Sequence, residues 1–136
     1  MRFLHIDSCH QHTTVLKDLR NFTPHIVENG VICIDDFNDP EYPGVNTAIA
    51  EFINSEEGKD WRIFAIGANK AYVCRKNYFD FYRNDLVRWI KKTVPQINVA
   101  FAEVFDKECA LFMGGNGLTD KEIEDILENK KERFYG

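Results

Sequence analysis

The sequence predicts an α/β domain in which helices flank a sheet of parallel strands that ends in a late antiparallel hairpin. Two short apolar runs are each followed directly by acidic residues: Arg2–Ile6 precedes Asp7, and Val31–Ile34 precedes Asp35 and Asp36. Apolar residues recur at helical spacing between these runs, so strand, helix and strand follow one another as in a right-handed βαβ unit. Two later strand-like runs are separated by a link short enough for a hairpin.

The first helix is predicted over His12–His25, because Val15, Leu16 and Leu19 recur at helical spacing and Pro24 helps to end it. Apolar period, turn residues and prolines place the remaining elements in the same way. The strands are a central strand at Val31–Ile34, two hairpin strands at Trp61–Ile66 and Ala71–Arg75, and two further strands at Val99–Phe105 and Cys109–Met113. The helices are Val45–Ile53, an amphipathic helix at Tyr78–Thr93 and a charged terminal helix from Thr119 to Glu132. Gly114–Gly117 is predicted to be a flexible break, and Thr119–Glu122 a capping box.

Composition limits the possible classes of protein. The chain has 136 residues, enough for one domain, and 44% of them are apolar, as in ordinary globular proteins. The formal net charge of −5 argues against a nucleic-acid partner, which needs a basic face. The apolar runs are too short to cross a bilayer, and the four cysteines lack the CxxC spacing of zinc sites. We therefore expect a cytoplasmic protein with reduced thiols and neither a membrane nor a nucleic-acid partner.

The acids after the two strands form the candidate site. Carboxyl ends of neighbouring parallel strands meet at one edge of a sheet, so Asp7, Asp35 and Asp36 should converge there with His10 nearby. Three carboxylates and an imidazole suggest a divalent cation and a general base. The structural alternative is that the acids bind loop amides and that His10 is an ordinary loop residue. His5, inside the strand, is predicted to be a hydrogen-bonded core residue.

Three segments carry a resemblance to a known family: HIDSCH (His5–His10), GVICIDDF with DPEYPGV (Gly30–Val45), and AIGANKAYVCRK (Ala65–Lys76) with its asparagine-lysine pair. In order and spacing they resemble the carboxyl half of class I S-adenosylmethionine-dependent methyltransferases, with a Rossmann-like sheet. The closer likeness is to metal-dependent sugar O-methyltransferases that act on macrolide antibiotics and to cephalosporin-hydroxylase-like proteins. The resemblance covers about residues 2–90.

The resemblance implies an O-methyltransferase-like protein that uses S-adenosylmethionine and Mg²⁺ or a similar cation on a sugar or other small hydroxylated acceptor. Asp7, Asp35 and Asp36 match the metal ligands, and His10 matches the proposed base. In the family, a glycine-rich turn that binds the cofactor precedes the HID strand, so residues 1–136 resemble a single domain that lacks the amino-terminal cofactor-binding half. Ser8-Cys9 also departs from the family's pattern, which leaves acceptor specificity open.

The expected partner follows from the first strand. In the family this strand has a neighbour on each side, so we expect Phe3–Ile6 to be an exposed sheet edge that invites pairing. We expect a homodimer at this edge, or a second chain that supplies the cofactor half. The alternative function is non-enzymatic: a methyltransferase remnant that binds a metal or small ligand, or that serves as an assembly subunit.

Overall fold

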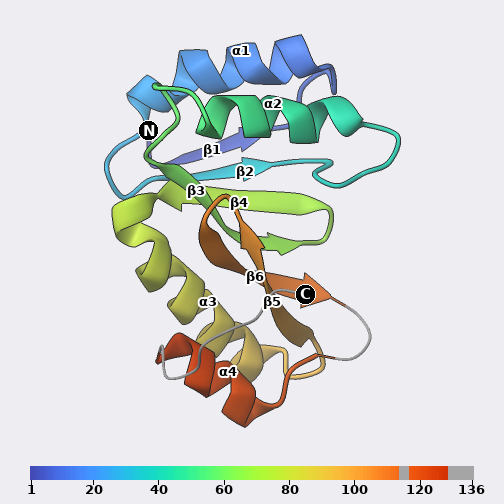
Figure 1. The fold of residues 1–136 in the computed structure, drawn as a ribbon, viewed down its shortest axis with the longest axis vertical. Coiled ribbons are helices and arrows are strands. Elements are labelled where there is room, and N and C mark those ends of the chain that lie inside the picture. Colours follow the sequence, from blue (N-terminus) through green and yellow to red (C-terminus); the bar gives the residue numbers. More distant parts are fainter. Residues whose placement is uncertain (114–116, 129–136) are drawn as a thin grey trace.

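A computed structural model of the chain describes residues 1–113 and 117–128. Figure 1 shows the elements in order of sequence. The strands are β1 (Phe3–Ile6), β2 (Val31–Ile34), β3 (Trp61–Gly67), β4 (Lys70–Arg75), β5 (Asn98–Val104) and β6 (Lys107–Met113). The helices are α1 (His12–Phe22), α2 (Pro43–Ile53), α3 (Phe79–Thr93) and α4 (Asp120–Leu127), with short 3-10 turns at Thr23–His25 and Lys76–Tyr78.

The strands form one six-stranded sheet in the order β1-β2-β4-β3-β6-β5. β1 and β2 are parallel, β4 is antiparallel to both β2 and β3, and β6 is parallel to β3 and antiparallel to β5. The predicted Rossmann-like α/β sheet with a late antiparallel hairpin is therefore confirmed. The β5–β6 hairpin extends this sheet on the side away from β1 (Figure 1).

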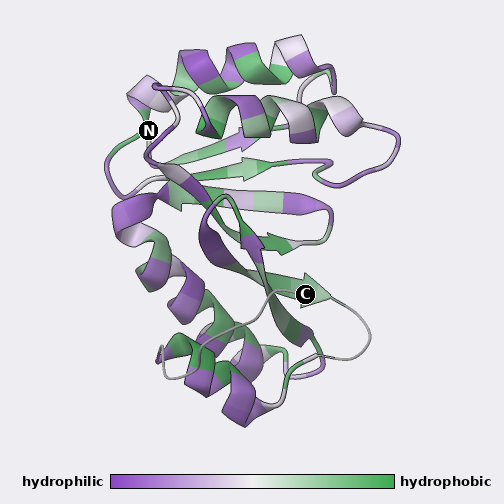
Figure 2. Cartoon of the chain, in the orientation of Figure 1, coloured by the Kyte–Doolittle hydropathy of each residue, from purple (hydrophilic) through white to green (hydrophobic). Residues whose placement is uncertain are grey.

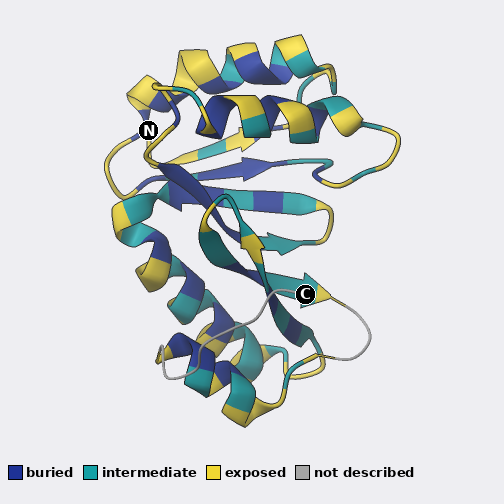
Figure 3. Cartoon of the chain, in the orientation of Figure 1, coloured by how far each residue is buried: buried dark blue, intermediate teal, exposed yellow. Residues whose placement is uncertain are grey.

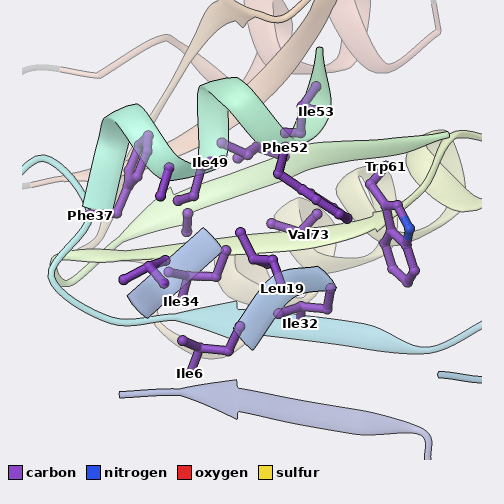
Figure 4. Packing of buried hydrophobic residues seen from close by; sticks show 14 of the residues in the cluster. Ile6, Leu19, Ile32, Ile34, Phe37, Ile49, Phe52, Ile53, Trp61 and Val73 are labelled. Atoms are coloured by element: carbon purple, nitrogen blue, oxygen red, sulfur yellow. The ribbon is translucent and has the colours of Figure 1, made fainter. Parts of the chain in front are cut away.

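One face of the sheet is covered by α1 and α2. Leu19 of α1 and Ile49 and Phe52 of α2 are each 1% exposed and pack in a single cluster with Ile32 and Val73 of the sheet (Figure 4). Figure 2 shows apolar residues running through β2, whereas the two helices alternate between apolar and polar positions. This alternation gives each helix a stripe that faces the sheet and a side that faces solvent.

The other face is covered by α3. Its residue Phe79 packs with Phe64, Ala65 and Cys74 of β3 and β4. The short α4 packs farther along, where Ile123 and Ile126 join a third cluster with residues of α3, β5 and β6. In Figure 1, α1 and α2 lie at one end of the long axis of the molecule, and α3 and α4 extend toward the other end.

β1 is an edge strand, as predicted, because among the described residues it pairs with β2 and with no other strand. Figure 3 shows that β2 is mostly buried whereas β1 is largely not. Phe3 and His5 are exposed, and Ile6 is the buried residue of the strand. The prediction that His5 is a core residue is therefore wrong. Side chains alternate along a strand, and Phe3 and His5 share the face that α1 and α2 do not cover.

The predicted elements agree with the structure to within a few residues. The α-helical part of the first predicted helix ends at Phe22, and Thr23–His25, which includes Pro24, continues as a 3-10 turn. The capping box at Thr119 and Glu122 is confirmed by both reciprocal hydrogen bonds. Residues 114–116 of the predicted break and the predicted helical extension beyond Glu128 lie outside the described residues. Within the described ranges, no helix has the length and apolar character needed to cross a membrane.

Candidate functional site

The acid-bearing ends of β1 and β2 lie side by side. The strands run in register, with Ile6 opposite Ile34, and the amide of Asp35 donates to the Ile6 carbonyl at 3.0 Å. Asp7 and Asp35 are the next residues of the two strands, so both enter the same edge of the sheet. We call this region, comprising Asp7, His10, Asp35 and Asp36, the acid edge.

The loop after β2 is held in a specific shape. Asp36 and Asn38 adopt left-handed backbone conformations, with φ of 55° and 62°, which aspartate and asparagine tolerate better than most residues. The Phe37 amide donates to the Asn69 carbonyl at 2.9 Å. Asn38 and Asn46 of α2 exchange hydrogen bonds of 2.8 and 2.6 Å. These bonds fix the loop to the β3–β4 turn and to α2, and thereby position Asp36.

Two overlapping groups of side chains have the spacing of cation ligands. His5, Asp7 and Asp35 form one group, and Asp7, His10 and Asp36 form the other. Within each group, one ligand atom from every residue lies within 4.8 Å of the others. Asp7 belongs to both. Carboxylate oxygens are the ligands that Mg²⁺ prefers, and imidazole nitrogen suits transition metals, so either class of cation is chemically compatible with the acid edge.

His10 contacts Asp36 and stacks against an aromatic ring. Its Nε2 atom is shielded from solvent and lies 2.5 Å from Asp36 Oδ2, but the two groups are not aligned as a hydrogen bond. The contact is therefore an ion pair whenever the imidazole is protonated. The Tyr42 ring stacks on the imidazole with centroids 3.9 Å apart. A Cβ at Gly44 would lie 2.8 Å from the His10 carbonyl, so glycine allows α2 to begin this close to the histidine.

The β3–β4 turn contributes two polar partners to the acid edge. Lys70 Nζ donates to Asp35 Oδ1 at 2.7 Å and to Asn69 Oδ1 at 3.3 Å, while Asn69 Nδ2 donates to Asp36 Oδ1 at 3.1 Å. The hydrogen bond from Lys70 lowers the pKa of the Asp35 carboxyl and, reciprocally, raises the pKa of the Lys70 ammonium. Asp35 therefore stays ionised at neutral pH.

The acid edge has an excess of negative charge. Lys70 supplies one fixed positive charge against the carboxylates of Asp7, Asp35 and Asp36. Carboxylates at this spacing repel one another unless a cation or a proton lies among them. A protonated His10 beside Asp36 would reduce the excess, and a divalent cation would remove more of it. The arrangement is thus suited electrostatically to holding a cation.

A hollow of about 450 Å³ opens beside the acid edge, on the face that carries α2. Asn38, Asp39 and Asn69 supply its polar wall, and Ile66 and Leu111 belong to its apolar wall. Asn69 connects the two features, because it lines the hollow and also donates to Asp36. A small molecule in this hollow would therefore lie next to the carboxylates.

The structure brings together all four predicted site residues: Asp7, His10, Asp35 and Asp36. Their roles as metal ligands and base stay predictions. Sequence reasoning missed His5, which joins Asp7 and Asp35, and it assigned no site role to Asn69 and Lys70. The alternation of side chains along β1 could have indicated that His5 is exposed, because His5 shares a face of the sheet with Phe3 rather than with buried Ile6.

A family model described as a methyltransferase domain matches residues 1–37. The matched segment contains β1, α1, β2 and all four residues of the acid edge, and it ends before α2. Comparisons with curated proteins and with solved structures give no significant match. The family match supports a methyltransferase-like domain and reaches as far as the carboxylates of the acid edge.

Proposed function

We propose that the chain is the acceptor-binding part of a metal-dependent O-methyltransferase that uses S-adenosylmethionine. The observation that carries this proposal is the acid edge itself, where Asp7, His10 and Asp36 lie within 4.8 Å of one another inside the segment that matches a methyltransferase domain. The proposed acceptor is a sugar or another small hydroxylated molecule, and it binds in the hollow lined by Asn38, Asp39 and Asn69.

The proposed metal ligands are Asp7, Asp35 and Asp36. Asp7 and Asp36 have carboxylates without a lysine or arginine partner among the described residues, whereas Asp35 must share its oxygen with Lys70. When bound, Mg²⁺ would supply a Lewis acid for an acceptor hydroxyl. The oxygen-rich donor set fits this cation.

His10 is the proposed base. Nε2 faces Asp36 and the ring is stacked on Tyr42, so contacts with these two residues fix the orientation of the imidazole. The other ring nitrogen, Nδ1, has no hydrogen-bond partner among the described residues and is the atom left to take a proton from an acceptor hydroxyl. The base and the hydroxyl would have to meet at the mouth of the hollow, since Asn69 joins the hollow to Asp36.

The described residues do not fit S-adenosylmethionine. The link between β1 and α1 contains no glycine, and the described part of the chain offers no glycine-rich turn between a strand and a helix. Binding of this cofactor is therefore assigned to a polypeptide segment that adds to β1, from a partner chain or a longer product. The free edge of β1 and the exposed Phe3 support this assignment.

Isothermal titration with MgCl₂ and with MnCl₂ tests the metal site. Asp7→Asn and Asp36→Asn should each weaken binding by about tenfold or more, because each removes a charged ligand. Asp18→Asn, on α1 and outside both ligand groups, is the matched control and should bind like the wild type. Equal binding by all four proteins would contradict the metal site.

The second candidate function is non-enzymatic, with the chain acting as a metal-binding or assembly subunit. The edge position of β1 favours it, because Phe3 is 58% exposed on a strand with an unpaired side. Because cofactor binding is assigned to another segment, calorimetry with S-adenosylmethionine and Mg²⁺ separates the candidates when that segment is present, in the longer product or with the partner chain: heat supports the enzyme, and no heat favours the subunit. Light scattering that shows a clean monomer at micromolar concentration would count against assembly through β1.

A further inference from the structure

A large apolar groove lies between α3 and the sheet face that α1 and α2 do not cover. Its volume is about 1030 Å³, more than twice that of the hollow beside the acid edge. Its walls include side chains of β3, β4, β6 and α3: Phe64, Tyr72, Phe81, Tyr82, Trp89 and Phe112. We call this feature the α3 groove. Pockets of this size with predominantly apolar, aromatic walls are typical small-molecule sites.

The floor of the α3 groove is built from fixed aromatic rings. Tyr82 stacks on Phe64 with ring centroids 5.5 Å apart, and its hydroxyl donates to the Asn29 carbonyl at 2.5 Å. Phe64 also contacts Tyr72 of the neighbouring strand, with centroids 6.3 Å apart. Because these rings hold one another in place, the floor exists before any ligand binds.

The rim of the α3 groove is exposed. Phe81 and Trp89 lie two turns apart on α3 and are 60% and 57% exposed, and Met113 at the end of β6 is 46% exposed. Large apolar side chains that gather at the mouth of one concave surface mark a binding site more often than scattered exposed residues do. Occupation of the groove would cover the rings of Phe81 and Trp89.

The charge of the groove selects among ligands. Among its described lining residues, Asp85 alone is charged, and Gln96 is a further polar one. Within the described ranges, the Asp85 carboxylate has no ion-pair or hydrogen-bond partner, unlike Arg88 and Lys91 on the same helix, which pair with acids of α4. Aromatic faces also attract cations through their electron-rich rings. The Asp85 carboxylate and the aromatic rings of the groove therefore both favour a ligand that carries a positive charge.

We propose that the α3 groove binds a flat, apolar organic cation of the arylalkylamine class. The apolar ring system would lie between α3 and the sheet, against Phe64 and Tyr82, and the ammonium would face Asp85 and the ring of Trp89. This site is separate from the acid edge and does not depend on the proposed methyl transfer.

Three naphthalene probes of equal ring size test the proposal: 1-naphthylmethylamine, 1-naphthalenemethanol and 1-naphthaleneacetate, which are cationic, neutral and anionic at pH 7. The chain has two tryptophans, so its ¹H-¹⁵N spectrum contains two indole signals, and Trp89→Phe assigns them. We expect the amine to shift the Trp89 indole signal and to bind about fivefold more tightly than the alcohol. The acetate should bind most weakly.

Asp85→Asn should bring the affinities of amine and alcohol to within about twofold of each other, while the alcohol still binds. Asp80→Asn is the matched control, because Asp80 is an exposed acid on the same helix that does not line the groove. It should leave the preference for the amine unchanged. Equal affinities in the wild type, or a preference that survives in Asp85→Asn, would overturn the proposal. A Trp89 signal that responds to protein concentration but to no probe would also overturn it, in favour of a second copy as the occupant.

Discussion

The two halves of the molecule, residues 1–53 and the described residues from 61 onward, differ in where their polar and apolar side chains lie. In residues 1–53, the apolar side chains of α1, α2 and β2 close into one core, and the polar groups gather at the acid edge. In residues 61–113 and 117–128, Phe81 and Trp89 of α3 stay exposed around a groove, while Arg62 and Arg83 are buried. The two candidate sites therefore differ in chemistry: the acid edge gathers several charged groups, whereas the α3 groove is mostly apolar and has one charged residue, Asp85, among its described lining residues.

The β3–β4 turn connects the two halves. Gly67 and Ala68 line the α3 groove, and the next residues, Asn69 and Lys70, bind Asp36 and Asp35 of the acid edge. Ala68 and Asn69 both adopt positive φ, 50° and 56°, which gives the primed type of turn that suits the twist of a two-stranded hairpin. The second half therefore completes the site of the first.

The difference in packing gives the largest expected effect. Phe52→Ala in α2 removes a side chain that is 1% exposed and should lower the free energy of unfolding by about 3–5 kcal/mol. Phe81→Ala in α3 removes the same side chain from a position that is 60% exposed and should cost less than about 1 kcal/mol. Urea denaturation measures both. Equal losses would mean that the groove is covered in solution.

One buried arginine of the second half, Arg62, forms an ion pair with a carboxylate. Arg62 Nε donates to Asp106 Oδ1 at 2.6 Å, and this bond lowers the pKa of the Asp106 carboxyl. Asp106→Asn keeps a residue that tolerates the positive φ of this turn but removes the charge. We expect a loss of about 1 kcal/mol in unfolding free energy at pH 7, because the charge-assisted hydrogen bond is replaced by a neutral one.

The pH dependence of this loss has a definite sign. A carboxyl with a lowered pKa in the folded protein stabilises it above the unfolded pKa, and the contribution disappears as pH falls through the folded value. The ordinary pKa of an aspartate carboxyl, which applies to Asp106 in the unfolded chain, is 3.8. The difference in unfolding free energy between wild type and Asp106→Asn should therefore hold from pH 7 to about pH 5 and shrink below about pH 3.8. A difference that grows in acid would contradict the assignment to Asp106.

The cation contributed by the turn should compete with a metal at the acid edge. Lys70→Met removes the positive charge next to Asp35 and should tighten Mn²⁺ binding by about fivefold, the effect of roughly 1 kcal/mol between unit charges at about 4 Å in water. The matched control is Lys59→Met, because Lys59 lies just before β3, at the end of that strand away from the β3–β4 turn, and pairs with Glu56. This substitution should leave the affinity for Mn²⁺ unchanged. Weaker binding after Lys70→Met would show that Lys70 positions Asp35 rather than competing for it.

The first half was more predictable from sequence than the second. The short apolar runs before Asp7 and Asp35, with helical periodicity between them, predicted two parallel strands and their shared edge. The stacking of Tyr42 on His10 depends on how α2 approaches the loop, which no local pattern encodes. In the second half the element bounds were predicted, but the parallel pairing of β3 with β6 joins segments more than 40 residues apart. Residues of both strands line the α3 groove, so its shape depends on a pairing that sequence periodicity does not encode.

Paramagnetic relaxation by Mn²⁺ tests most directly whether the tips of β1 and β2 share a cation. At substoichiometric Mn²⁺, the account predicts that amide signals of Asp7, His10, Asp35 and Asp36 broaden first in the ¹H-¹⁵N spectrum, that Asp85 and Asp106 are spared, and that excess Mg²⁺ restores the signals. Broadening centred on other acids, or spread evenly over the chain, would contradict it.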